Sequence, residues 1–309
     1  MKSAVAGAIG VGVGVVLACA ASVGAQWPKY QTSDVPRDAQ GKVRMDAAPP
    51  RTPDGKPDLS GMWQRADRDP LPAEIAGLVG DRGGRAGRGA VPAIEPPTAP
   101  FPPDRNSPPL ATFFELGANV AGGLPFTPWA ADVRKQRMAT SDKDNPDANC
   151  MPMGFTQFHM QPQPRTIIQT PKLILIEYEA NYGLRHIYMD GRKLPPQGEL
   201  QPWWYGYSVG RWDGDTLVVE TNNVRGADAG PYDGWLDVRG SPYSDQAIFT
   251  ERFRRPIFGK LEIDVTLEDA KAYTRPFTVR INQRVVVDEE LIEFICNENQ
   301  QFRRRVKID

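Results

Sequence analysis

Polar and apolar residues alternate along the chain from residue 165 onward, and this alternation restricts the possible folds more than any other feature. A period of two places the apolar side chains on one face of a β-strand. Turn-like segments such as Asn181-Tyr182-Gly183 and Asp213-Gly214 separate the alternating stretches. The expected strands are residues 166–170, 172–180, 183–190, 204–212, 215–224, 247–255, 260–269, 277–287 and 291–299.

Short strands joined by tight turns are typical of an antiparallel meander, and closing the meander into a barrel removes its exposed edges. We therefore predict a mainly β fold, either an antiparallel up-and-down, lipocalin-like barrel or a strongly curved sheet. The barrel domain is expected to cover residues 111–309. Short helices are expected at its start, over residues 112–121 and 129–139, and the second would place Trp129, Val133 and Met138 along one face.

Two segments precede this domain. Residues 26–110 contain about half of the 30 prolines and the run "GDRGGRAGRGA", which predicts an extended Pro/Gly-rich arm that wraps the barrel. Leu59 and Trp63 are its expected anchors. Residues 1–25 are typical of a signal peptide, because Lys2 is followed by an apolar run that is too short and too rich in Gly and Ala for a membrane span.

The residues at the end of the predicted signal peptide indicate whether the protein is released by cleavage or anchored by a lipid. Small residues before Gln26 favour cleavage near Ala25, whereas lipid attachment at Cys19 is less favoured because Leu17 is bulky. We expect an exported protein, periplasmic or extracellular, without a membrane span. A net charge of −1 without a basic run argues against a nucleic-acid partner, which would need clustered Lys and Arg.

Cleavage of the signal peptide leaves Cys150 and Cys296 as a pair in an oxidising compartment, which predicts a disulfide. Such a link closes a long loop and is worth about 3–5 kcal/mol in the chain-entropy model. A metal pair or a nucleophilic cysteine would need further ligands or bases, and the chain contains only His159 and His186 as histidines. Neither a metal site nor a cofactor is predicted.

The segment "LILIEYEANYGLRHIYMDGR", residues 173–192, carries charged residues in the middle of two apolar strands. If Gly183 occupies the left-handed position of a three-residue hairpin loop, Glu179 lies opposite Arg185, and Glu177 shares their face. Because an unpaired buried charge is costly, Glu177 and Arg185 are a candidate buried ion pair, with catalysis and a purely structural salt bridge as alternative roles. On the other face, His186 is expected to lie beside Tyr178, Tyr188 and Asp190.

The second hairpin, "WWYGYSVGRWDGDTLVVET", places small residues between two tryptophans. Trp204, Ser208 and Trp212 share a face with Gly206 and Gly210, so they form a trough that either receives core side chains or lines a ligand pocket. "GYSVG" matches the nucleophile-elbow pattern, but a hairpin is the wrong context for Ser208 to act as a nucleophile. The opposite face carries Tyr205, Tyr207 and Arg211.

Several motifs together resemble a family of exported, largely uncharacterised bacterial proteins that is expanded in soil and aromatic-degrading lineages. They are "GKPDLSGMW", "RHIYMDGR", "YSVGRWDGDTLVVET", "FTERFRR" and "VTLEDAKAYTRPF", and the resemblance covers the chain from about residue 50. It is loosely associated with glutathione-independent cleavage of β-aryl ethers from lignin. Such cleavage expels a phenolate from Cβ with help from a neighbouring hydroxyl or from water, and it needs a base and a group that stabilises the phenolate.

The resemblance implies roles for residues of the two hairpins. Glu177 would be the base, Arg185 or His186 would meet the phenolate, and Tyr188 and Trp204 would hold the rings. The further candidates for substrate contact are Tyr178, Asp190, Ser208, Arg211 and His159.

Three functions therefore stay open. The first is a cofactor-independent lyase or hydrolase that cleaves aryl ethers. The second is a lipocalin-like carrier of an apolar or aromatic ligand, and the third is an envelope structural or interaction protein. The expected partner is a small aromatic or apolar molecule, and the oligomeric state is left open.

Overall fold

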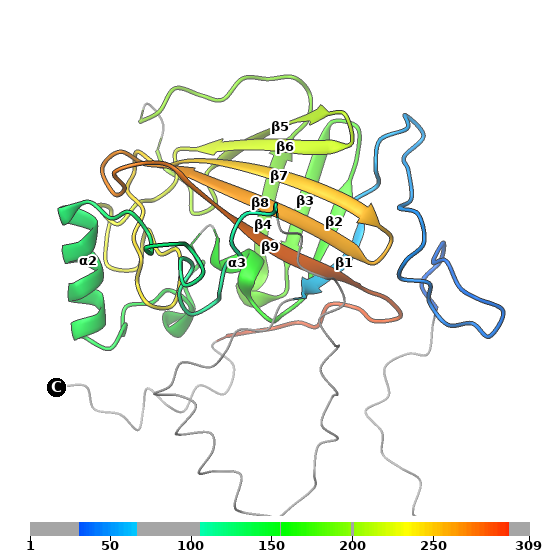
Figure 1. Ribbon diagram of the computed structural model, residues 1–309, viewed down its shortest axis with the longest axis horizontal. Coiled ribbons are helices and arrows are strands. Elements are labelled where there is room, and N and C mark those ends of the chain that lie inside the picture. The colour runs from blue at the N-terminus through cyan, green and yellow to red at the C-terminus, as the bar shows by residue number, and fades with distance from the viewer. Residues whose placement is uncertain (1–30, 67–105, 155, 199–200, 297–309) are drawn as a thin grey trace, which may run out of the picture.

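The computed structural model describes residues 31–66, 106–154, 156–198 and 201–296, and nine strands in these ranges form a closed barrel (Figure 1). The predicted mainly β barrel is thus confirmed, and the open curved sheet is not formed. Each strand pairs with its neighbours in chain order, and the first pairs with the last. The strands are β1 (Gly61–Arg65), β2 (Arg165–Gln169), β3 (Leu173–Tyr178), β4 (Gly183–Tyr188), β5 (Tyr207–Asp213), β6 (Thr216–Asn222), β7 (Ile248–Ile257), β8 (Lys260–Glu268) and β9 (Phe277–Val286).

The pairing of β4 with β5 differs from all the other pairings in the barrel. These two strands run parallel and share only two residue pairs, Ile187 with Ser208 and Tyr188 with Val209, whereas the other neighbours are antiparallel. A parallel step needs a crossover connection, and residues 189–206 supply it. We call this short parallel pairing the seam, because it is the place where the backbone ladder of the barrel is weakest.

The arm contributes a strand instead of only wrapping the barrel. β1 pairs with both β2 and β9, so residues that were expected to form an extended arm close the barrel. The predicted anchors Leu59 and Trp63 are fully buried. Beyond β1, the backbone amides of Ala66 and Ala111 donate hydrogen bonds to β9 carbonyls two residues apart. The predicted boundary between arm and barrel domain therefore cuts through one structural unit.

The predictions of helices and of the last strand were partly wrong. Residues 112–121 form turns, and residues 291–296 form no strand; residues 297–299 lie outside the described ranges, as does the predicted signal peptide. The helix α2 (Pro128–Ala139) is confirmed, with Thr127 as its N-cap. The predicted apolar stripe is not the buried face of this helix, whose buried side chains are Ala130 and Arg137. Arg137 can be buried because its guanidinium donates to the backbone carbonyls of three loop residues, Asp233, Gly234 and Gly240.

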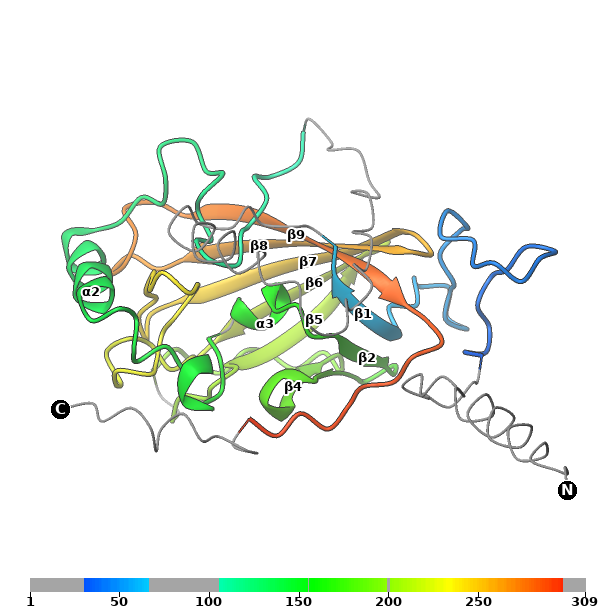
Figure 2. The same cartoon turned by 90° about the horizontal axis from the view of Figure 1, so that it is seen from below.

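A short helix, α3 (Gln157–Met160), lies inside one end of the barrel (Figure 2). All four of its side chains are buried, and Phe158 packs against Tyr178 and Tyr205 with ring centroids 4.5 and 4.7 Å apart. Residues 31–58 of the arm lie at the opposite end of the barrel. Among the described residues, no helix has the length and apolar character that crossing a bilayer requires.

The disulfide between Cys150 and Cys296 is confirmed and links residues 146 positions apart. We expect the Cys150→Ser, Cys296→Ser double variant to lose about 3–5 kcal/mol of unfolding free energy, because the unfolded chain regains the entropy of the open loop. Urea unfolding of the variant, with reduced wild type as the matched control, measures this. Unfolding midpoints that coincide with that of the oxidised protein would contradict it.

Candidate functional site

The hairpin of β3 and β4 forms with a different register from the predicted one. Asn181, not Gly183, occupies the left-handed position, with φ of 54°, and Gly183 is extended. Arg185 therefore lies opposite Ile176, and Glu177 lies opposite Leu184. The predicted alternation within each strand is correct, but the relative phase of the two strands is not. Arg185 points into the barrel, Glu177 is exposed on its outer face, and the predicted Glu177–Arg185 pair does not form.

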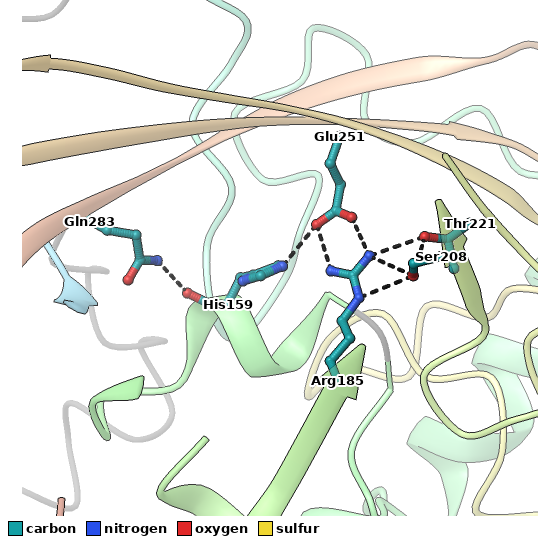
Figure 3. Close-up of polar contacts among 6 residues, drawn as sticks. All are labelled: His159, Arg185, Ser208, Thr221, Glu251 and Gln283. Atoms are coloured by element: carbon teal, nitrogen blue, oxygen red, sulfur yellow. Dashed lines mark hydrogen bonds and ion pairs between the residues drawn. The ribbon is translucent and has the colours of Figure 1, made fainter. Parts of the chain in front are cut away.

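Arg185 instead forms a buried ion pair with Glu251 of β7 (Figure 3). Its Nη1 and Nη2 atoms donate to the two carboxylate oxygens at 3.0 and 2.5 Å. The guanidinium also donates to Ser208 Oγ of β5 at 3.1–3.3 Å and to Thr221 Oγ1 of β6 at 3.0 Å. Both charged side chains are at most 3 % exposed. One arginine thus connects β4 to three other strands across the interior.

His159 extends this cluster from α3. Its Nε2 lies 2.9 Å from Glu251 Oε1, and its backbone carbonyl accepts a hydrogen bond from Gln283 Nε2 of β9 at 2.7 Å. Burial lowers the pKa of His159, so the imidazole is neutral at neutral pH. Because a carboxylate can only accept, the consistent tautomer has Nε2–H donating to Glu251.

The ionisation of the cluster follows from two opposing effects. Burial by itself raises the pKa of Glu251, but attraction to Arg185 and hydrogen bonds from His159 and Arg185 outweigh it and lower this pKa to about 2. Burial raises the pKa of Tyr178 to about 12, so its phenol stays protonated. Arg185 and Glu251 therefore compensate each other, whereas the buried guanidinium of Arg165 in β2 donates to the backbone carbonyls of Gln161 and Gln163.

A cleft of about 240 Å³ opens at the seam, and we call it the seam cleft. Arg185 and Ser208 reach it from the interior, and aromatic rings line the rest. Tyr207 is central to these rings, since its centroid lies 5.2 Å from that of Tyr188 and 5.5 Å from that of Trp203. The lining residues are Leu184, Arg185, His186, Tyr188, Trp203, Trp204, Tyr205, Gly206, Tyr207 and Ser208.

Two other hollows lie near the seam cleft. One, of about 530 Å³, continues past Trp203 and Trp204 to Arg225. The other, of about 480 Å³, lies at the mouth of the barrel and includes Trp212. The mouth cavity is larger than the seam cleft but contains no member of the buried cluster, so we place the candidate reactive site at the seam cleft.

The structure brings together five of the predicted site residues at the seam cleft, and places the others elsewhere. Tyr178 and His159 lie in the interior around the ion pair, whereas Asp190 lies outside and holds Arg192 over the Tyr188 ring. Arg211 is exposed and lines the mouth cavity. The predicted trough is partly filled, because a Cβ atom at Gly210 would lie 2.5 Å from Met189 Sδ. The five residues at the seam cleft are Arg185, His186, Tyr188, Trp204 and Ser208.

Glu251 was missed by the sequence reasoning, although the sequence holds a signal for it. Phe249, Glu251 and Phe253 alternate with the more exposed residues of β7, so the glutamate lies on the face of the strand that carries the apolar side chains. A charged residue on the apolar face predicts a partner of opposite charge that also points into the barrel. The partner itself could not be read from β7.

Among the residues that the structure describes, no group of three or more His, Cys, Asp or Glu side chains is arranged to hold a metal ion. Comparison of the chain with models of protein families, with curated proteins and with solved structures gives no match. The chemistry of the seam cleft and the buried cluster is therefore the basis for a functional conclusion.

We expect Glu251→Gln to lower the unfolding free energy by about 3–5 kcal/mol, because it leaves the buried Arg185 charge without its counter-ion. The matched control is Glu268→Gln at an exposed position of β8, which should change it by less than about 0.5 kcal/mol. Urea unfolding compares the two variants. Equal changes in unfolding free energy for the two variants would show that the Arg185–Glu251 pair makes no specific contribution to stability.

The same pair predicts a pH dependence of stability. The pKa of Glu251 falls from 4.5 to about 2 on folding, so the unfolded chain binds the proton first and the contribution of this carboxylate is lost as pH falls through that window. His159, whose pKa is also lowered on folding, adds a loss that begins below its ordinary pKa of about 6.5. The stability difference between wild type and Glu251→Gln should therefore shrink as pH falls from 4.5 to 2; a constant difference would contradict the assignment.

Proposed function

We propose that this protein is an exported enzyme that acts on small aromatic compounds and cleaves an aryl ether bond of the lignin β-aryl type without a cofactor. The observation that carries the proposal is the seam cleft, where aromatic rings surround an opening that reaches a buried arginine and a serine hydroxyl. Stacked rings bind aromatic substrates, and a desolvated cation stabilises a departing phenolate. The disulfide is consistent with export to an oxidising compartment.

The dimensions of the hollows fit a two-ring substrate. A cleft of about 240 Å³ accommodates one substituted ring beside Tyr188 and Tyr207. The neighbouring hollow shares Trp203 and Trp204 with the cleft and gives the second ring a place. The guanidinium of Arg225 lies 4.3 Å from the Trp204 ring centroid and holds that ring in position.

In the proposed reaction a base removes a proton from the substrate hydroxyl next to Cβ, or from water. The oxygen then forms a bond to Cβ, the bond from Cβ to the aryl oxygen breaks, and its electron pair leaves on the phenolate. His186 lines the cleft and is exposed, so it is the base that we assign in place of Glu177. Protonation of the phenolate by the imidazolium completes the reaction and regenerates the base.

The buried cluster has a positioning role in this scheme. Ser208 Oγ accepts from Arg185 and lies 2.8 Å from Thr221 Oγ1. The polarised Ser208 hydroxyl can thus turn toward a phenolate in the cleft, with the charge of Arg185 behind it. Glu251 and His159 hold the guanidinium in place and do not contact the substrate.

The proposal predicts release of guaiacol when the purified mature protein is incubated with a guaiacyl β-aryl ether dimer and no added cofactor. Release should fall by about 10²-fold or more in His186→Gln, whose exposed site leaves folding intact, because general acid–base catalysis is worth about that factor. Mass spectrometry follows the product, and heavy oxygen in the solvent distinguishes attack by water from attack by the substrate hydroxyl.

Two arginine variants provide a matched comparison. Arg185→Met should abolish release, whereas Arg275→Met, at an exposed position remote from the cleft, should leave it unchanged. Thermal melts of each variant separate loss of chemistry from loss of folding. No release from a folded wild type that still binds the dimer would reject the enzyme and favour a carrier.

The complete hydrogen bonding of Arg185 favours a second candidate, in which the cluster only stabilises the barrel of an envelope protein. Buried ion pairs commonly perturb pKa values without taking part in chemistry. In that case His186→Gln would change neither binding nor stability, and Arg185→Met would lower stability alone.

A further inference from the structure

We propose that the mouth of the barrel, at the end opposite α3, is a second binding site that takes a neutral, mainly apolar small molecule. The site is independent of the seam cleft and of the function proposed for it. Its cavity measures about 480 Å³, a volume typical of pockets for small ligands. Two features of the site determine which ligand it can take: its outer wall is fixed, and its lining carries one positive and one negative side chain.

The cavity lies between the barrel rim and a short hairpin of the arm, residues 51–57, which we call the strap. Arg51 and Pro57 form an antiparallel bridge that closes the strap. The rim contributes residues from the β2–β3 turn, from the start of the crossover connection and from β5. The apolar part of the lining consists of Pro53, Pro171, Met189, Gly191, Gly210 and Trp212.

Polar contacts hold the strap against the rim. Arg51 forms a bidentate ion pair with Asp215 at 2.6 and 3.0 Å, so Asp215 is bound to the arm. Lys56 Nζ donates to the carbonyl of Gly214 at 3.3 Å. Gln169 accepts from the amide of Leu59 at 2.9 Å and donates to the carbonyl of Pro57 at 3.2 Å. The cavity therefore has two fixed walls instead of one wall and a loose loop.

The floor of the cavity can adapt to a ligand. Met189 lies over Gly210, where a Cβ atom would come within 2.5 Å of the Met189 sulfur and 3.0 Å of Ile187 Cγ2. Glycine at this position therefore leaves the space that the thioether occupies. Because methionine is unbranched and polarisable, it can repack around ligands of different shape.

The charges at the rim favour a neutral ligand. The cavity is lined by one cationic and one anionic side chain, Arg211 and Asp54, and the ion pair of Arg51 with Asp215 lies beside it. A ligand with a net charge is attracted by one of the two lining groups and repelled by the other. The seam cleft, which includes a buried arginine, has no acidic residue in its lining. The two sites should thus differ in the charge that they accept.

Two fluorescent probes with the same ring system test this difference. Phenylnaphthylamine is neutral, and anilinonaphthalenesulfonate adds a sulfonate to it. Titrated into the full mature protein, the neutral probe should bind the mouth and accept energy from Trp212, and the anion should bind the mouth at least about tenfold more weakly. Asp54→Asn should reduce the difference between the affinities of the mouth for the neutral and the anionic probe.

The site is located by a matched pair of proline variants. Pro53→Trp fills the cavity from the strap and should weaken the neutral probe about tenfold or more. Pro276→Trp makes the same change at an exposed position of the opposite end and should leave affinity within about twofold. Trp204→Ala alters the seam cleft and the hollow beside it but no lining residue of the mouth cavity, so it should also leave the affinity for the neutral probe unchanged.

The result that would overturn the proposal is binding of the neutral probe that survives Pro53→Trp or is lost in Trp204→Ala, or no binding by a folded wild type. Energy transfer supplies a readout that does not depend on the folding of the blocking variant. In Trp212→Phe the probe should still bind, while tryptophan quenching at saturation falls. Quenching that is undiminished would place the probe elsewhere.

Discussion

The ion pair of Arg185 with Glu251 is the interaction on which the site and the closed shape of the barrel depend. Neither charge is tolerable in an apolar interior alone, so each requires the other. The seam contains only two backbone residue pairs, and Arg185 compensates for this weakness through its contacts with Ser208 and Thr221 on the next two strands. The same guanidinium thus joins the strands at the place where the backbone joins them least.

The two ends of the barrel are closed in different ways, and this difference separates two kinds of site. At one end α3 fills the interior with four buried side chains and supplies His159 to the ion pair. At the other end the arm covers the rim and leaves a cavity. The seam cleft lies on the side of the barrel, where Arg185 and Ser208 reach an outer surface of aromatic rings.

This arrangement explains how one protein can carry charge inside a barrel and still have aromatic rings around a cleft in its wall. The acid of the cluster stays ionised because the arginine and the histidine stabilise its anion. The arginine in turn contributes positive potential at the cleft through Ser208, without exposing its own guanidinium to water. A structural cluster would have the same ion pair, but it would not need aromatic rings gathered at a cleft that Arg185 and Ser208 both line.

The sequence alone determined the local features: the strands between residues 165 and 286, the helix at 128–139, and the disulfide. It did so because period-two alternation and residue type act over a few neighbours. The tertiary structure decided the partners. One left-handed residue at Asn181 instead of Gly183 reversed the phase of β3 and β4 and moved Glu177 outside. The true partner of Arg185 lies 66 residues away. Only closure of the barrel, completed by β1 of the arm and filled by α3, brings Glu251 and His159 to it. Alternation along one strand does not specify which strand that strand faces across the interior.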